Sequence, residues 1–217
     1  MRRILGILLA TVFATNACSD RGLSRSRAEQ LITSHDTFKA QAFFSFTTEM
    51  GFTKGTIASA CLGQADVERD PATAMLLKSG WVSIDTRPTA IWIGRQANCP
   101  ALVLTPKGQE ASARWQSRPT GIGQGWSWSI PIGERKLVEI TGLTQGPDGA
   151  TYAELTWKWN PNSMGEQLQA SALPKAKEFF ELTRRGRASC RLWDDGWRCK
   201  MDHIGTRFED AGQFPVS

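Results

Sequence analysis

The stretch Thr151–Trp159, with the sequence TYAELTWKW, has the most regular apolar pattern in this chain. One set of alternate positions is apolar and the other is mostly polar: Ala153, Leu155, Trp157 and Trp159 alternate with Tyr152, Glu154, Thr156 and Lys158. Successive side chains of a strand point to opposite faces of a sheet. The pattern therefore predicts a strand in an antiparallel sheet with one covered face and one solvated face.

Neighbouring segments predict further strands of this sheet. Leu137–Thr141 is one, and the turn-forming residues Gly146–Gly149 separate it from Thr151–Trp159. Residues 116–135 are rich in glycine, serine and proline, so we expect a boundary between two lobes there. The alternating tryptophans in that range predict a Trp-rich strand. Pro131 has no N–H to donate to a ladder, so it makes this an edge strand or ends the strand early.

Helices are expected to cover the sheet. Apolar residues at helical spacings predict helices over Ala28–Met50 and over Glu166–Leu182, the second interrupted or started by Pro174. Two shorter helices are expected over Pro71–Lys78 and Thr105–Trp115, each with a proline in the first turn after a capping side chain. These elements predict an α+β class, in which helices cover short antiparallel sheets. The chain would form one domain or two small lobes, cross-linked by disulfides.

Six consecutive segments follow from these patterns. They are a signal peptide at 1–17, a lipidated cysteine and flexible tether at 18–27, an N-terminal α+β lobe at 28–115, a linker with the Trp-rich edge strand at 116–135, a C-terminal α+β lobe at 136–203 and a loose tail at 204–217. The chain that remains after removal of the signal peptide is long enough to bury a core without a metal ion.

The N-terminus has the features of an export signal. Arg2 and Arg3 precede the apolar run Ile4–Phe13, and the short, small-residue stretch Ala14–Ala17 follows it. As a helix, the apolar run spans about half of a bilayer core, which is too short for a permanent membrane span. The sequence therefore predicts a chain that is exported and cleaved.

Cys18 directly follows this exit, and the segment resembles the signal peptide of bacterial lipoproteins. In that family the cysteine becomes the lipidated first residue of the mature chain, so the resemblance implies a lipid anchor on Cys18. Ser19 after it resembles the pattern of lipoproteins that are forwarded to the outer membrane. We expect an outer-membrane lipoprotein that faces the periplasm.

The other cysteines are Cys61, Cys99, Cys190 and Cys199, an even number that suits disulfides in an exported protein. Four cysteines allow three pairings. We favour 61 with 99 and 190 with 199, because a two-residue hairpin loop at Asp194–Asp195 places the second pair directly opposite each other. Disulfides are favoured over a zinc or redox site, since the chain has no Cys-x-x-Cys motif.

The sequence has no recognisable catalytic or metal-binding motif. His35 and His203 each have an aspartate neighbour, but adjacent residues point in different directions and do not pair a base with its orienting carboxylate. Asp194 and Asp195 suit a hairpin turn, and too few oxygen ligands lie near them for calcium. We expect no catalytic residue, no metal and no cofactor.

Residues 72–115 resemble the helix, strand, turn, strand pattern of winged-helix domains. The residues that carry the resemblance are Leu76, Gly80, Leu104, Thr105 and Gly108. The helix that would enter DNA, Pro71–Lys78, lacks arginine, asparagine and glutamine side chains that read base edges. The formal net charge of +5 is also mild. The resemblance therefore implies shape only, and we expect no nucleic-acid partner.

The C-terminal hairpin is the predicted partner-binding surface. Trp193 and Trp197 flank its tip beside Arg191 and Arg198, and such residues are typical of binding hot spots. Most other tryptophans are expected to pack in the core. We expect a non-catalytic binding or assembly module that meets an envelope protein or a glycan. The alternatives are a periplasmic inhibitor or immunity protein against a hydrolase and, more distantly, an envelope hydrolase.

Overall fold

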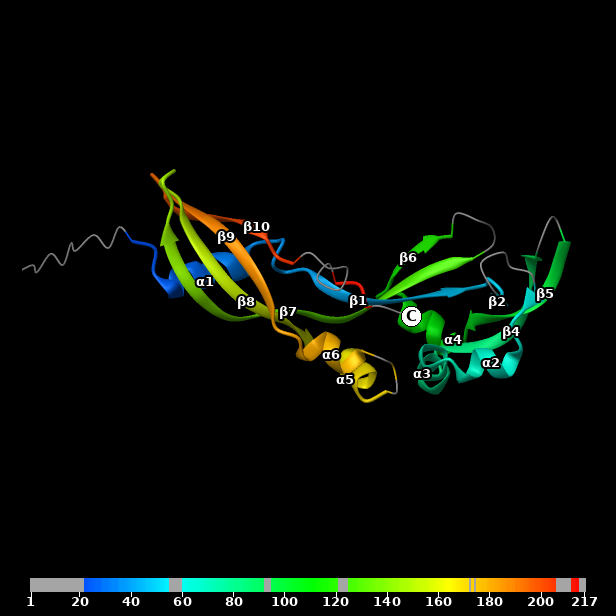
Figure 1. The fold of residues 1–217 in the computed structure, drawn as a ribbon. Coiled ribbons are helices and arrows are strands. Elements are labelled where there is room, and N and C mark those ends of the chain that lie inside the picture. The colour runs from blue at the N-terminus through cyan, green and yellow to red at the C-terminus, as the bar shows by residue number, and fades with distance from the viewer. Residues whose placement is uncertain are drawn as a thin grey trace, which may run out of the picture.

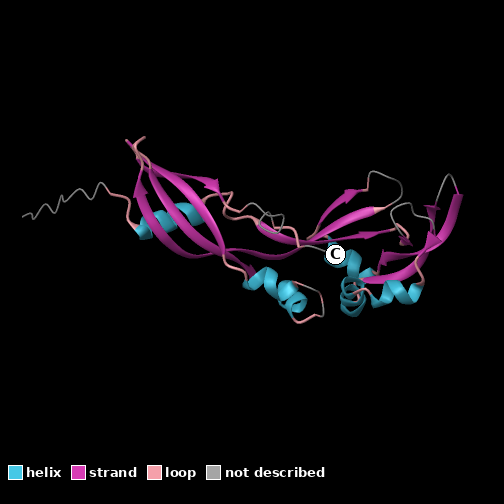
Figure 2. Ribbon diagram, viewed as in Figure 1, coloured by secondary structure: helices cyan, strands magenta, loops and turns pink. Residues whose placement is uncertain are grey.

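Strands dominate the fold of this protein (Figure 2). The computed structural model describes residues 22–54, 60–91, 95–120, 125–171, 173, 175–205 and 212–214. The expected signal peptide, the expected lipidation site Cys18 and the first part of the tether lie outside the described residues. About 50% of the described residues are in strands and 26% are in helices, so the protein is mostly β. The expected α+β class is therefore wrong.

The main sheet contains six described strands, all antiparallel, in the order β1-β7-β8-β9-β10 with β6 also paired to β7 (Figure 1). The strands are β1 (Gln41–Thr48), β6 (Gln116–Pro119), β7 (Trp126–Gln145), β8 (Thr151–Pro161), β9 (Arg184–Trp193) and β10 (Gly196–His203). The sheet curls into a half-barrel. Strand β8 has the predicted alternation, with Trp157 and Trp159 fully buried.

Strand β7 joins two parts of the sheet. Its first half pairs with β1 on one side and β6 on the other, and its second half pairs with β8 from Gly133 onward. Pro131 lies in the gap between the end of β6 pairing at Ser129 and the start of β8 pairing. Its missing N–H therefore breaks no ladder bond on that side. The expected edge strand is wrong, because β7 has partners on both sides.

Helix α1 (Arg25–Ser34) packs against β7 and β10, and its buried face contains Ala28 and Ile32. The helix expected over Ala28–Met50 is confirmed only up to Ser34, where α1 ends. The rest of that range forms β1, in which Ala42 and Phe44 are fully buried and the residues beside them are not. A period of two describes this segment better than a helical spacing.

Two short helices cover the other end of the half-barrel, within the range where the sequence predicts a helix interrupted or started by Pro174. They are α5 (Ser163–Gln169) and α6 (Ala176–Glu181), and both contact β8. Phe179 of α6 stacks on Trp159 with ring centroids 6.1 Å apart. Phe214, expected in a loose tail, is buried and lies 5.4 Å from the Phe179 ring. The end of the described chain is therefore part of the core.

The segment between β1 and β6 forms a smaller unit. It consists of β2 (Thr53–Lys54), β3 (Ala60–Cys61), α2 (Gln64–Arg69), α3 (Pro71–Ser79), β4 (Val82–Ile91), β5 (Arg95–Leu104) and α4 (Pro106–Ser112). The predicted caps are confirmed. The Asp70 side chain accepts from the Thr73 N–H, and the Thr105 side chain accepts from the Gly108 N–H. Gly80 ends α3 in the left-handed region with φ 73°, where glycine is favoured.

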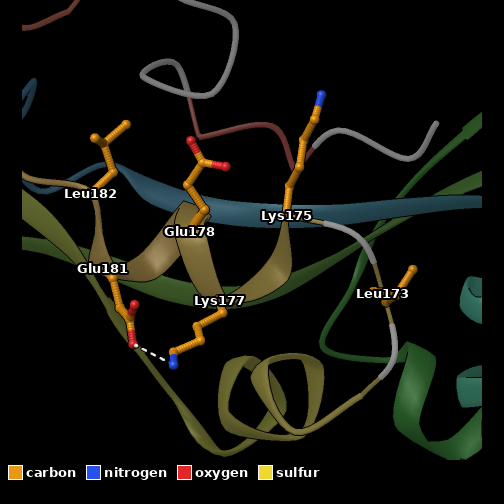
Figure 3. Close-up of a pocket in the computed structure, with 6 residues that line it drawn as sticks. All are labelled: Leu173, Lys175, Lys177, Glu178, Glu181 and Leu182. Carbon is orange, nitrogen blue, oxygen red and sulfur yellow. Dashed lines mark ion pairs between the residues drawn. The ribbon is translucent and has the colours of Figure 1, made fainter.

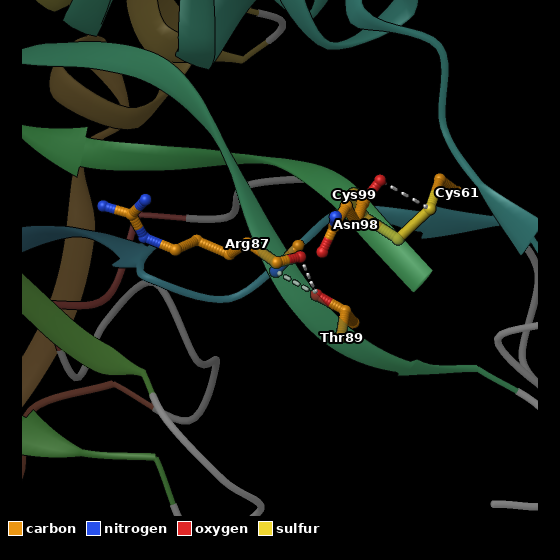
Figure 4. The surroundings of a disulfide bond; sticks show 6 residues. Cys61, Arg87, Thr89, Asn98 and Cys99 are labelled. Atoms are coloured by element: carbon orange, nitrogen blue, oxygen red, sulfur yellow. Dashed lines mark hydrogen bonds between the residues drawn. A yellow bond between two sulfur atoms is a disulfide. The ribbon is translucent and has the colours of Figure 1, made fainter. Parts of the chain in front are cut away.

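Both predicted disulfides are present. Cys61 of β3 bonds to Cys99 of β5, beside the Arg87 and Thr89 positions of β4 (Figure 4). Cys190 bonds to Cys199 directly opposite it in the β9–β10 hairpin, as the predicted two-residue loop requires. Disulfides indicate an oxidising compartment, so the protein is exported. Within the described residues, no helix combines the length and apolar character needed to cross a bilayer.

Candidate functional site

The β9–β10 hairpin brings three of the four predicted binding residues to one face. Arg191 lies opposite Arg198 in the register, and Trp193 is two residues from Arg191, so all three lie on the outer face of the sheet. Trp193 is 56% exposed. Trp197 is on the other face, where it is partly buried and packs against the core. The predicted cluster is therefore split between two faces.

Both arginines of this face have acidic partners. Arg191 lies 2.5 Å from the Asp148 carboxylate in the β7–β8 turn, and Arg198 pairs with Asp195 in its own turn. The pKa of Asp148 is lowered, first by the hydrogen bond from the Ala150 backbone N–H and then by the charge of Arg191. Asp148 is thus ionised at neutral pH, and the charges of Arg191 and Arg198 are both paired within the protein.

Apolar area remains at the hairpin tip once the charges are paired. The Arg198 guanidinium carbon lies 5.8 Å from the centroid of the Trp193 ring, a cation–π geometry that orients the exposed indole. Leu192 is also exposed, on the opposite face. We call Leu192, Trp193 and Arg198 the hairpin tip. The sequence does not identify Leu192 as an exposed binding residue, because a lone leucine in an alternating strand predicts a buried position.

An aromatic cluster lies where the smaller unit meets the main sheet. Trp115 follows α4, and its ring centroid lies 5.2 Å from Trp81, 5.9 Å from Phe46 and 6.1 Å from Trp128. The Trp128 indole N–H donates to Thr48 Oγ1 at 2.9 Å. These contacts come from segments that are distant in sequence. The cluster is therefore a packing junction between the two parts of the chain, which suits the expected core role of most tryptophans.

A polar groove lies on the sheet formed by β1, β6 and β7. It is on the face opposite to the one that carries Phe46 and Trp128. Its volume is about 470 Å³, and its lining consists of Ser45, Gln116, Ser117, Arg118, Ser127, Ser129 and Gln213. Ser45 and Ser129 face each other across β1 and β7 with their hydroxyl oxygens 2.9 Å apart. The sequence does not reveal this groove, because its residues come from four separate segments and match no motif.

A second surface pocket lies beside α6 and has a different character. Its charged residues are the neighbours Lys175, Lys177, Glu178 and Glu181. Figure 3 shows Lys177 and Glu181 pointing toward each other, and their charged atoms are 3.8 Å apart. Opposite charges four residues apart on a helix, such as Lys177 and Glu181, are typical of a solvated surface. We assign no chemistry to this pocket.

The two histidines form no catalytic pair with their neighbouring aspartates. The Nδ1 atom of His35 accepts a hydrogen bond from the Thr37 backbone N–H, and His203 is exposed at the end of β10. Asp202 accepts from the Ser189 hydroxyl at 2.7 Å. No group of three or more potential metal ligands occurs among the described residues.

Comparisons with known proteins give no relative from which a site could be transferred. The hairpin tip and the polar groove therefore have to be interpreted from their own geometry. Neither protein-family models nor curated proteins nor solved structures match this chain.

Proposed function

We propose that this protein is a lipoprotein, anchored through Cys18 to the outer membrane and facing the periplasm, that binds another envelope protein through its hairpin tip. The observation that carries the proposal is the exposed Trp193 ring held beside Arg198 at the end of a disulfide-braced hairpin. Exposed tryptophan and arginine side chains are the residues that most often dominate protein–protein binding energies.

The pairing of charges favours a protein partner over an anionic glycan at the hairpin tip. Arg191 and Arg198 already have carboxylate partners, so these two side chains are less available to bind an anion. The exposed side chains of Leu192 and Trp193 instead offer apolar area. Burying that area releases water from both partners and stabilises a complex. The Cys190–Cys199 disulfide restrains the hairpin before binding and so lowers the entropic cost of association.

The proposed anchor places the hairpin tip close to the membrane. A tether from Cys18 to the start of α1 at Arg25 extends at most about 25 Å. Figure 1 shows α1 and the β9–β10 turn at the same end of the elongated molecule, and α1 contacts β10. A partner bound at this end would lie in or near the membrane that holds the anchor.

Trp193→Ala is expected to weaken partner binding at least tenfold while leaving the circular dichroism spectrum unchanged. The reason is that the ring is exposed, so its removal costs contact area in the complex and little packing in the free protein. The measurement is affinity capture from cells that express the tagged protein, followed by binding assays with the captured partner. Val138→Ala is the matched control, because Val138 is also exposed but lies in β7 outside the hairpin tip.

Retention of the partner by the Trp193 variant would rule out the hairpin tip as the binding surface. Equal loss in the Trp193 and Val138 variants would also contradict it, because the effect would then not be specific to the tip. A spectrum that changes in Trp193→Ala would mean that this ring stabilises the fold.

A further inference from the structure

The three-stranded part of the sheet, β6-β7-β1, has one aromatic and one polar face. Register pairs place Ser45 opposite Ser129, Gln116 opposite Ser129 and Arg118 opposite Ser127. Paired residues of adjacent strands share a face of the sheet. Phe46 and Trp128 are paired on the other face, which packs against Trp115. Except for Ser117, which is paired with Trp128, the groove residues of β1, β6 and β7 therefore share one face of the sheet and form a continuous surface.

Several groups of the groove have no partner within the described part of the chain. Arg118, Gln116 and Ser127 form no side-chain hydrogen bond or ion pair with any residue described there. Ser45 and Ser129 bond to each other, and Gln213 Oε1 accepts from the Ser45 hydroxyl at 3.5 Å. The Arg118 guanidinium, unpaired among the described residues, thus lies beside a row of hydroxyl and amide groups that can still donate and accept hydrogen bonds.

We propose that the polar groove binds an acidic saccharide, with Arg118 on its carboxylate and the serine and glutamine side chains on its hydroxyl groups. A guanidinium binds a carboxylate through two parallel hydrogen bonds. Sugar hydroxyls both donate and accept, which matches serine hydroxyls and glutamine amides. The volume of about 470 Å³ lies within the range of small-molecule sites and accommodates a monosaccharide.

Other ligand classes fit the lining less well. A divalent cation needs carboxylate or carbonyl oxygens, and the described residues that line the groove include no acidic side chain. A nucleic acid needs several cations along its backbone, whereas Arg118 is the one charged residue among the described residues of the lining. An apolar ligand would leave the serine and glutamine groups without hydrogen bonds. The single positive charge and the many neutral polar groups together favour a sugar with one acidic group.

The groove and the hairpin tip are separate surfaces. Figure 1 places β6 in the half of the elongated molecule away from the β9–β10 turn. The proposal therefore goes beyond the proposed function and does not depend on it. Trp193→Ala is expected to leave saccharide binding unchanged, and a variant of Arg118 is expected to leave capture of the protein partner unchanged.

Titration of the purified full-length mature protein with two sugars tests the saccharide proposal. The probes are N-acetylmuramic acid, which has a carboxylate, and N-acetylglucosamine, which lacks it. We expect N-acetylmuramic acid to bind at least tenfold more tightly in ligand-observed NMR titrations. Arg118→Ala is expected to weaken its binding at least tenfold and so remove most of the preference between the two sugars, because the guanidinium supplies that preference.

Arg185→Ala is the matched control, since Arg185 is an exposed arginine of β9 outside the groove. It is expected to bind both sugars as the unchanged protein does. A double variant, Ser127→Ala with Ser129→Ala, is expected to weaken binding of both sugars alike. The proposal is overturned if neither sugar binds, if the two bind equally, or if Arg185→Ala has the same effect as Arg118→Ala.

Discussion

Replacing Trp157 with alanine is expected to lower the free energy of unfolding by about 3–5 kcal/mol. Trp157 is fully buried in β8, and its ring centroid lies 5.2 Å from that of Trp159. The guanidinium carbons of Arg135 and Arg184 lie 4.8 Å and 5.4 Å from the Trp157 ring. The substitution would leave a large cavity and remove cation–π contacts with both arginines. Urea unfolding monitored by circular dichroism measures the loss.

Trp126→Ala is the control for Trp157→Ala. Trp126 is 46% exposed and lies at the start of β7, so its replacement creates little cavity. We expect a loss of no more than about 1–2 kcal/mol for this variant. Similar losses in the two variants would contradict a half-barrel core built around Trp157.

Removal of the Cys61–Cys99 disulfide is expected to destabilise the protein more than removal of Cys190–Cys199. The first closes a loop with a sequence separation of 38 and the second a loop with a separation of 9. A longer closed loop restricts the unfolded chain more. Loop entropy predicts losses of about 4 kcal/mol for Cys61→Ala with Cys99→Ala and about 2.5 kcal/mol for Cys190→Ala with Cys199→Ala. Urea unfolding of both double variants measures the difference.

The reverse order of the two losses would contradict the loop-entropy argument. Other contacts near Cys61–Cys99 are expected to remain in the first double variant. Arg87 pairs with Glu49 at 2.5 Å, and the Thr89 hydroxyl accepts from the Gly51 N–H at 3.1 Å. These contacts hold β4 to the end of β1, so the variant should keep its fold at low denaturant.

Elements with strong local signals could be predicted from the sequence. The alternation in Thr151–Trp159 gave a strand with the correct buried face. Asp70, Pro71 and Gly80 mark the ends of α3, because capping and left-handed backbone preferences act within a few residues. The pairing of Cys190 with Cys199 follows from a two-residue turn. In each case the determining interactions lie close together in the chain.

Elements that depend on distant partners could not be predicted in the same way. The range Ala28–Met50 contains aromatic residues at spacings that suit both a helix and a strand. The part of this range after α1 forms strand β1 because it pairs with β7. Strand β7 also extends through Pro131, which pairs with Phe43 of β1, although proline by local preference ends a strand or confines it to an edge. The first of these errors raised the expected helix content and contributed to the α+β class in place of a mostly β fold.

The candidate sites show the same difference between residues that are close in sequence and residues that are distant. Trp193 and its neighbours in the hairpin could be found because they are adjacent in sequence, although the inward position of Trp197 depends on the strand register. The polar groove could not be found, because Ser45 and Gln213 meet across a sequence separation of 168 residues. The ion pair between Arg191 of β9 and Asp148 in the β7–β8 turn could not be predicted either, because the two residues are distant in sequence.

Intact mass spectrometry of the mature protein from its native cells, before and after reduction, tests the central claim of an exported and anchored protein most directly. We predict a chain that begins at Cys18, carries the added mass of acyl groups, and has four cysteines that react with a thiol-alkylating reagent only after reduction. A chain that retains Met1, or cysteines that are alkylated without reduction, would contradict that claim.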